Sequence, residues 1–407
     1  MEDIKQKVKD LTSKDEKKAL SAAFEMVNNS DTEMYKELVK TSEYLFPFVK
    51  DNVAKRIDEV INKENYKNLF NFFDCYSPDY DYVFAEITAR YADENVRQNL
   101  RLMFENSDVP RKIYTARCFE FMPEPSLAKE FLKYAFDEND YLASSCSAAL
   151  GTIEDKTSYN MALEYLNSDD DFLKLKALNF FMSYGDNPSA EILIDALHKS
   201  KMPENIAGKI AYLMPVTDIL NENTEYGLDV LNYLLSGLGE ILPLSDIFCF
   251  EIYDSLSLLA KNNFKNNSSQ VAVILLKAKQ KFGMFMENDE YTFDEDKSTK
   301  DEIKAVSKLL NSFNSEFWLL QKSEVSGELS KSEKRQHSAL QIIREFNIKD
   351  SIHDIVEMIY ETESQTTICD GIAALKSLDA LVYINKEDVI SQITDSTLKA
   401  ITESYFG

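Results

Sequence analysis

Residues of like character recur along the middle of the chain at a nearly constant interval, and this repeat restricts the possible folds more than any other feature. Four series are offset by 32 and then by 31 positions: Tyr114, Cys146 and Ala177; Cys118, Leu150 and Phe181; Phe131, Leu163 and Ile194; and Tyr134, Leu166 and Leu197. Within a unit, 114 to 118 is an i,i+4 step and 131 to 134 an i,i+3 step, so each pair falls on one helix face. Each unit is therefore predicted to be two amphipathic helices that bury their apolar stripes only against neighbouring units. The repeat predicts an all-α fold, an α-α superhelix of antiparallel helix pairs.

The turns between these helices carry a second pattern. One unit reads Phe136-Asp-Glu-Asn-Asp-Tyr and then Ser147-Ala-Ala-Leu-Gly-Thr-Ile-Glu-Asp, and the next reads Asn167-Ser-Asp-Asp-Asp-Phe and then Ala177-Leu-Asn-Phe-Phe-Met-Ser-Tyr-Gly-Asp. Acidic turns and a helix ending in Ala-Leu-Gly resemble the short, bilin-lyase-type HEAT-like repeat, most clearly over residues 108–216. The chain departs from that family where an Arg is usual near the start of the first helix, because Ala143 and Lys174 lie nearby. The resemblance implies a HEAT/ARM-like solenoid.

Helical spacing continues outside this stretch. Asp15 and Asp31 are predicted helix N-caps, and Pro47 is predicted to begin or end a helix. Near the C-terminus the repeat returns, since Leu340, Ile343 and Phe346 recur 32 residues later as Ile372, Leu375 and Leu378. We predict four segments: an N-terminal helical region (1–107), HEAT-like repeats (108–216), a divergent helical region (217–327) with an acidic loop (287–302), and C-terminal HEAT-like helices (328–407).

Three serines are predicted to cap the second helix of successive units. Ser126, Ser158 and Ser189 align at the repeat interval, each where a second helix is expected to begin. A serine hydroxyl at this position accepts a hydrogen bond from an otherwise unpaired backbone N–H.

Composition and charge exclude several classes of partner and compartment. The formal net charge is −25, which disfavours phosphate backbones and anionic lipid surfaces, so neither nucleic acid nor membrane is expected as a partner. The five cysteines form no CxxC pair and lie among apolar neighbours, as reduced thiols of cytoplasmic proteins do. We expect no signal peptide, because the first residues contain no apolar run.

Motifs for catalysis or cofactors are missing from the sequence. There is no GxGxxG, GxxxxGK[ST] or GxSxG, and none of the three histidines begins an HExxH. His353 and Glu357 are spaced like half of a metal site, but an exposed pair is the simpler interpretation. The acidic stretch from Asp289 to Asp301 has no glycine for a calcium-binding turn. We therefore expect no catalytic residue, no metal and no cofactor, and interpret the aromatic stretch from Phe70 to Phe84 as core.

One polar helix face is the candidate partner-binding surface. Asn160, Glu164 and Asn167 stand at i, i+4 and i+7 on a predicted second helix, and Glu191, Asp195 and His198 are their repeat equivalents. On second helices such residues are expected to line the concave side of the stack and to suit a protein or peptide partner, possibly a basic one. The alternative is an ordinary solvated face.

Three functional hypotheses remain open. The missing motifs and the repeat favour a non-catalytic protein–protein interaction scaffold or adaptor that uses the concave face of a solenoid. The resemblance also implies HEAT-like enzymes or cofactor-handling proteins, either bilin-lyase-like or DNA-glycosylase-like, although the acidity fits the latter poorly. A third hypothesis is a structural domain of a larger assembly that self-associates through its solenoid ends.

Overall fold

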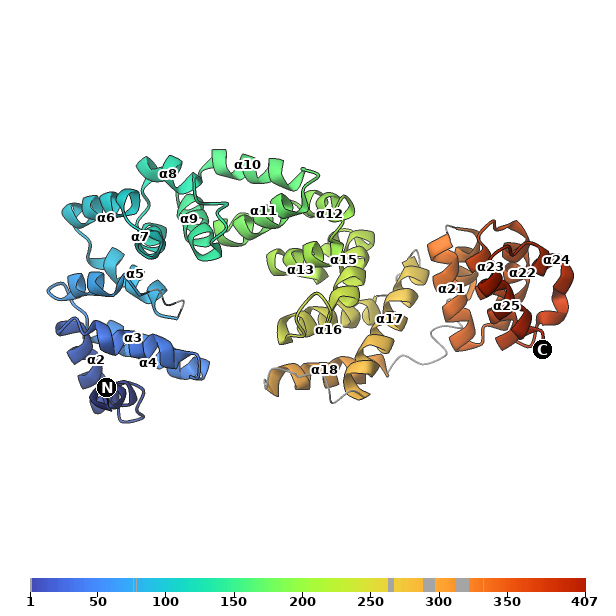
Figure 1. Cartoon of the computed structure of the whole chain (residues 1–407), viewed down its shortest axis with the longest axis horizontal. Helices are drawn as coiled ribbons and strands as arrows, with labels where there is room; N and C mark the ends of the chain where they lie inside the picture. The colour runs from blue at the N-terminus through green and yellow to red at the C-terminus, as the bar shows by residue number, and fades with distance from the viewer. Residues whose placement is uncertain are drawn as a thin grey trace. The chain divides into compact units, whose positions relative to one another are not determined.

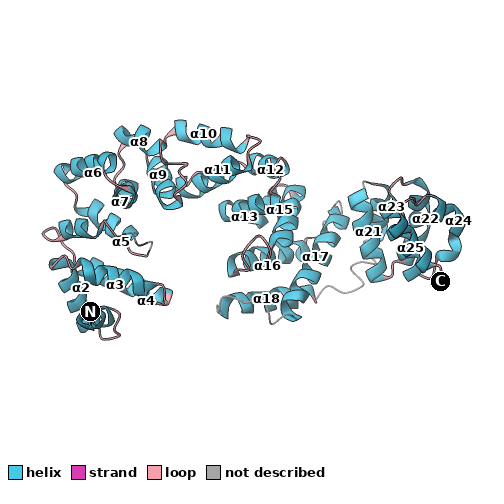
Figure 2. Ribbon diagram, in the orientation of Figure 1, coloured by secondary structure: helices cyan, strands magenta, loops and turns pink. Residues whose placement is uncertain are grey.

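The computed structural model of the chain is built from helices joined by short loops (Figure 2). It describes residues 2–75, 77, 79–262, 267–287, 297–311, 322–331 and 333–407. Across these ranges the only β feature is an isolated bridge between Leu238 and Leu242. The chain divides into two compact units, Met1–Ile192 and Leu193–Gly407. The predicted all-α class is thus confirmed.

Unit 1 ends with a regular series of helix pairs (Figure 1). Its elements are α1 Glu2–Leu11, α2 Glu16–Asn28, α3 Thr32–Ser42, α4 Pro47–Val60, η1 Tyr66–Phe72, α5 Asp81–Tyr91, α6 Glu94–Asn106, α7 Val109–Phe121, η2 Pro125–Leu127, α8 Ala128–Leu132, α9 Asp140–Thr152, α10 Lys156–Leu166 and α11 Asp171–Tyr184. α12 (Ala190–His198) contains the division between the two units.

Alternate helices of unit 1 stack into a row. α5 packs against α7, α7 against α9, and α9 against α11, while α6, α8 and α10 pack on α7, α9 and α11 respectively. The predicted repeat positions follow this row: Tyr114, Cys146 and Ala177 lie on α7, α9 and α11 and are 1%, 0% and 0% exposed. Because these equivalent positions on α7, α9 and α11 are buried alike, the stacking that the repeat predicts is confirmed for this row. Burial is less uniform in the two remaining series of the second helices, where Leu163 and Tyr134 are half-buried.

Gly151, the last residue of the Ala-Leu-Gly sequence, allows α9 to pack closely against the end of α11. A Cβ atom on Gly151 of α9 would lie 2.0 Å from the carbonyl oxygen of Tyr184 at the end of α11. No side chain fits at that distance, so glycine permits the close approach of the two helices. Lys174, which lies near the place where the HEAT-like family usually has an arginine, is buried and donates from Nζ to Asp171 Oδ1 over 2.9 Å.

The helix starts follow the capping rules, although not every residue predicted as a cap is one. Asp15 and Asp31 accept from the backbone N–H of Lys18 and Met34, and α4 begins at Pro47, as predicted. The prediction that Ser158 caps α10 is wrong. Asp155 accepts from the Ser158 N–H at 2.7 Å and is the cap, so Ser158 lies inside the helix.

The other two serines of that series lie at different places relative to their helices. Ser126 lies within η2, and the residues before η2 and α8 are Glu124 and Leu127, so the predicted cap at Ser126 is wrong as well. Ser189 directly precedes α12, and its role as a cap stays a prediction. Capping requires an acceptor side chain on the last non-helical residue, and the repeat interval alone does not decide which residue that is.

Unit 2 continues the alternation of helices. Its further elements are α13 Pro203–Leu213, α14 Val216–Glu222, α15 Thr224–Gly237, α16 Asp246–Lys261, α17 Ser268–Glu287, α18 Lys297–Leu310, α20 Lys322–Gly327, η4 Glu328–Ser330, α21 Glu333–Phe346, η5 Lys349–Ser351, α22 Ile352–Glu361, α23 Gln365–Ser377, η6 Leu381–Tyr383, α24 Lys386–Ser391 and α25 Ser396–Tyr405. α13, α15, α17, α21, α23 and α25 each pack against the next, and α14, α16 and α18 form a second row.

The row of stacked helices continues through residues 217–327, where the sequence has no constant repeat interval. α15, α16 and α17 have 14, 16 and 20 residues, so equivalent positions do not recur at one spacing, although each helix still buries an apolar face. Within the expected acidic loop (287–302), residues 288–296 lie outside the described ranges, and α18 begins at Lys297. The predicted boundaries at 107, 216 and 327 remain predictions about internal organisation.

Candidate binding site

The predicted partner-binding residues lie on two helices. Asn160 and Glu164 are exposed on α10, and Asn167 is the exposed residue directly after it, whose side chain donates to the Leu163 carbonyl over 3.1 Å. On α12, Glu191 and His198 are exposed. Binding of a partner to this surface stays a prediction.

The α12 residues have charged neighbours within unit 2. Asp195 is half-buried and pairs with Lys199 one turn further along. His198 Nε2 lies 2.8 Å from Asp229 Oδ2 of α15. Because Asp229 lines a hollow of unit 2, this pair connects one predicted residue to a concave feature that the repeat pattern did not predict.

Two adjoining hollows, which we call the unit 2 groove, lie along α15, α17 and α21. The first has a volume of about 340 Å³ and also reaches α20 and η4. The second, of about 450 Å³, also reaches α13. Asn232, Val273 and Ser338 line both hollows, so the two are continuous across these three residues.

The floor of the first hollow is apolar. Its buried side chains come from four helices and belong to the faces that hold those helices together: Leu228, Ile274, Val325, Ala339 and Ile342. A floor built from core residues keeps its shape, because each side chain is held by packing on the far side. The first hollow therefore combines a preformed apolar floor with a lining that also carries polar and charged side chains, as ligand sites commonly do.

Lysine and serine side chains hold one wall of the second hollow in place. Lys277 Nζ of α17 donates to the Asn232 carbonyl oxygen at 3.1 Å, to its Oδ1 at 2.9 Å and to Ser236 Oγ. These bonds join α15 to α17 and fix the orientation of the Asn232 amide. Because Asn232 Oδ1 accepts from Lys277, its Nδ2 group is the part of the amide turned away from that bond.

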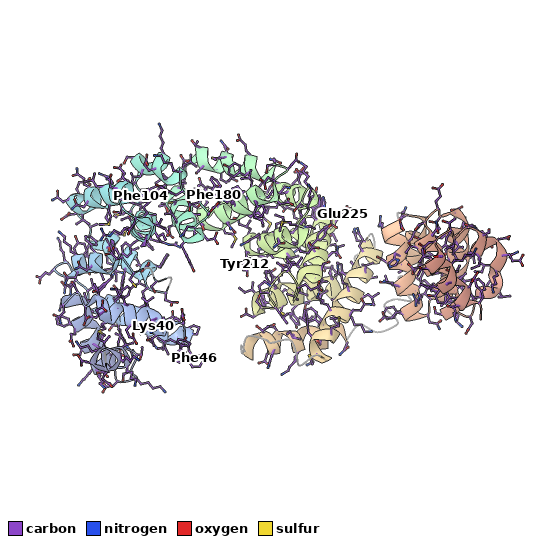
Figure 3. The ribbon with its side chains drawn as sticks, in the orientation of Figure 1. Lys40, Phe46, Phe104, Phe180, Tyr212 and Glu225 are labelled. Carbon is purple, nitrogen blue, oxygen red and sulfur yellow. The ribbon has the colours of Figure 1, made fainter. Side chains whose placement is uncertain are left out.

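Charge is unevenly distributed along the groove. In the first hollow, Arg335 forms a two-bond pair with Glu328, with Nη2 3.0 Å from Oε1 and Nε on Oε2. Glu225 and Asp229 stand one turn apart on α15 and add two further carboxylates (Figure 3 labels Glu225). The second hollow has Glu204 and Lys277 in its lining, whose formal charges cancel. The first hollow is thus the acidic end of the groove.

The sequence carried a signal for this site. Glu225, Asp229, Asn232 and Ser236 are spaced i, i+4, i+7 and i+11 and form one polar stripe on a helix that is otherwise strongly apolar. That stripe lies in the segment without a repeat interval, so it has no equivalent residues in neighbouring units.

Other groups considered from the sequence take structural positions. His353 and Glu357 are exposed on α22, as expected for a solvated pair. In the aromatic stretch Phe72, Phe73, Tyr80 and Phe84 are buried, whereas Tyr82 is exposed and Tyr76 lies outside the described residues. All five cysteines are unpaired, and all except the half-buried Cys75 are buried.

Metal-binding clusters and membrane-spanning helices are both missing from the described part of the chain. Over the ranges that the structure describes, no three His, Cys, Asp or Glu side chains converge in a way that would hold a metal ion. None of the described helices combines the length and the apolar character needed to cross a bilayer.

No protein-family model matches the chain, and no curated protein is similar to it at a significant level.

Proposed function

We propose that this chain is a non-catalytic, cytoplasmic protein–protein interaction scaffold whose unit 2 groove holds a segment of another protein. The observation that carries the proposal is the groove itself, in which two hollows with a shared lining run across three consecutive helices of one row. A row of stacked helices presents such a surface without any further chemistry, because its walls are the sides of neighbouring helices.

The lining suits an extended peptide. Peptide segments bring both apolar side chains and unpaired backbone N–H and C=O groups, and both need partners when they leave water. The apolar floor accepts the side chains, while Gln270 and Gln280 of α17, Gln341 of α21 and Asn232 carry amides that donate and accept hydrogen bonds.

Two sequence features support the wider proposal. The resemblance of residues 108–216 to HEAT-like repeats favours a solenoid that acts through its surface, and we propose membership of that family on this basis. Five unpaired cysteines favour a reducing compartment, which supports a cytoplasmic location.

Blocking the groove tests the proposal. Random short peptides displayed on phage are selected against the full chain, and the selected peptides are then measured against Val273→Trp, which fills the boundary between the two hollows. We expect affinity to fall by at least about tenfold, because the large side chain occupies the apolar space that the peptide needs.

The matched control places the same substitution outside the groove. Val382 is 83% exposed on η6, so Val382→Trp adds the same side chain to unit 2 and is expected to leave peptide affinity unchanged. Ser338→Phe, which also fills both hollows, repeats the test if Val273→Trp lowers the melting temperature. Selected peptides that bind both groove variants as tightly as the unmodified chain would contradict the proposal.

A further inference from the structure

The two hollows of the groove differ in the charge that remains for a ligand. In the first, the guanidinium of Arg335 is committed to Glu328 through two bonds, so this pair has no net charge. Glu225 and Asp229 then leave the hollow with two formal negative charges, with the His198 imidazole on Asp229 as the neighbouring titratable group. In the second hollow Glu204 and Lys277 balance each other.

The acidic end also has an apolar lining close to its carboxylates. Glu225 and Asp229 flank Leu228 on α15, and Ile274 and Ile342 face the same hollow from α17 and α21. Lysine and arginine match this combination, because their aliphatic stems bury against apolar surface while their charged ends reach carboxylates. A neutral aliphatic side chain would bring no positive charge to Glu225 or to Asp229, which already bonds His198, and an acidic side chain would be repelled.

We propose that the first hollow is a pocket for one lysine or arginine side chain of the segment held in the groove, with its cationic group between Glu225 and Asp229. The neighbouring hollow then receives an uncharged part of the same segment. This inference rests on the proposed function and assigns it a class of partner, namely a protein segment with a basic residue next to aliphatic ones. Charge-assisted hydrogen bonds to two carboxylates in a partly enclosed site provide the selectivity.

The test uses peptides already shown to bind the groove, so it is separate from the test of the groove itself. Phage-selected peptides that lose affinity for Val273→Trp are measured against Glu225→Gln/Asp229→Asn. We expect each to carry Lys or Arg, to bind the double variant about tenfold more weakly, and to lose much of its dependence on salt concentration. Replacing the basic residue of the peptide by Gln should produce a similar loss and make the peptide insensitive to the double variant.

A matched control removes two carboxylates at another place in unit 2. Asp218 and Glu222 are exposed carboxylates with the same four-residue spacing on α14, outside the groove. Asp218→Asn/Glu222→Gln removes the same charge from the chain and is expected to leave affinity unchanged. If it weakens binding as much as the groove variant does, the effect comes from net charge and the pocket assignment is overturned.

The remaining outcomes separate the two proposals. Groove-binding peptides without a basic residue, or with affinity unchanged by Glu225→Gln/Asp229→Asn, would overturn the basic pocket and leave the groove standing. A selection that yields no peptide sensitive to Val273→Trp would overturn both.

Discussion

At the scale of single residues, Asp81 is a carboxyl group that unit 1 buries among uncharged hydrogen-bond donors. Its side chain accepts from Tyr35 Oη and from the Ser77 backbone N–H, both at 3.1 Å, and the residue is 5% exposed. Burial raises the pKa of Asp81 to about 7, although the hydrogen bonds from Ser77 and Tyr35 and the charge of Arg117 act in the opposite direction. Charging this carboxyl inside the protein therefore costs free energy.

We predict that this cost makes stability depend on pH. The folded state holds the Asp81 proton more tightly than the unfolded chain, whose aspartate pKa is near 3.9. The contribution is therefore fully present below about pH 4 and is lost as pH rises through about 7, a loss on the order of 2–4 kcal/mol. Urea unfolding followed by circular dichroism at several pH values between these limits measures it.

The variant Asp81→Asn distinguishes the contribution of Asp81 to the pH dependence of stability from that of the other titrating groups. The variant is expected to show a much weaker decline in unfolding free energy between pH 5 and pH 8, because asparagine carries no proton to lose. Asp51→Asn, at an exposed position of α4, should keep the pH dependence of the unmodified chain. An Asp81→Asn variant that also keeps it would show that other groups cause the effect.

At the scale of elements, close approach between helices depends on where glycine stands. Gly151 lies against the backbone of Tyr184, and Gly371 of α23 lies against Ile359 and Met358 of α22. Among the residues that the structure describes, a Cβ atom on Gly283 of α17 would meet nothing within 4 Å beyond its own stretch of helix, so none of the described neighbouring helices requires a glycine there. The same residue type is thus a packing requirement in one helix and a weak point in another.

We predict opposite effects of alanine at two of these positions. Gly151→Ala should lower the free energy of unfolding by about 1–3 kcal/mol, because a methyl group would overlap a carbonyl oxygen that belongs to the backbone and cannot rotate away. Gly283→Ala should raise it by roughly 0.5–1 kcal/mol, since alanine favours the helix and meets no neighbour. Urea midpoints of the two variants give the comparison, and equal shifts in one direction would contradict the packing account.

At the scale of the whole molecule, charge and architecture are linked. Each unit stacks helices in rows, and the helix faces that are not packed against a neighbour accommodate a large share of acidic side chains. A formal net charge of −25 nevertheless means that like charges repel across the folded surface.

We predict that screening this repulsion stabilises the chain. Raising ionic strength from about 0.01 M to about 0.15 M shortens the Debye length from roughly 30 Å to roughly 8 Å, which weakens repulsion between separated charges more than attraction within close pairs. The melting temperature is expected to rise by a few degrees, equally in sodium chloride and potassium chloride. A fall in melting temperature would show that attractive pairs dominate the surface electrostatics.

The local sequence was sufficient to predict the helices and the faces that they bury. Apolar residues at helical spacing have to leave water, and a helix that is apolar on one side needs a neighbour, so Tyr114, Cys146 and Ala177 could be assigned to one buried row without coordinates. The helix starts at Asp15, Asp31 and Pro47 are also predictable from the local sequence, because capping involves residues only a few positions apart.

The tertiary structure alone decided where the chain is hollowed. The groove unites Asp229, Val273, Arg335 and Ile342, which lie on three helices far apart in the sequence and share no interval. Its shape depends on how helices of unequal length pack, and packing responds to the volume of every side chain between them rather than to a periodic pattern. Helix formation and burial depend on residues close together in the sequence, so they can be predicted from it. A concave surface depends on packing contacts among several helices at once, so only the tertiary structure determines it.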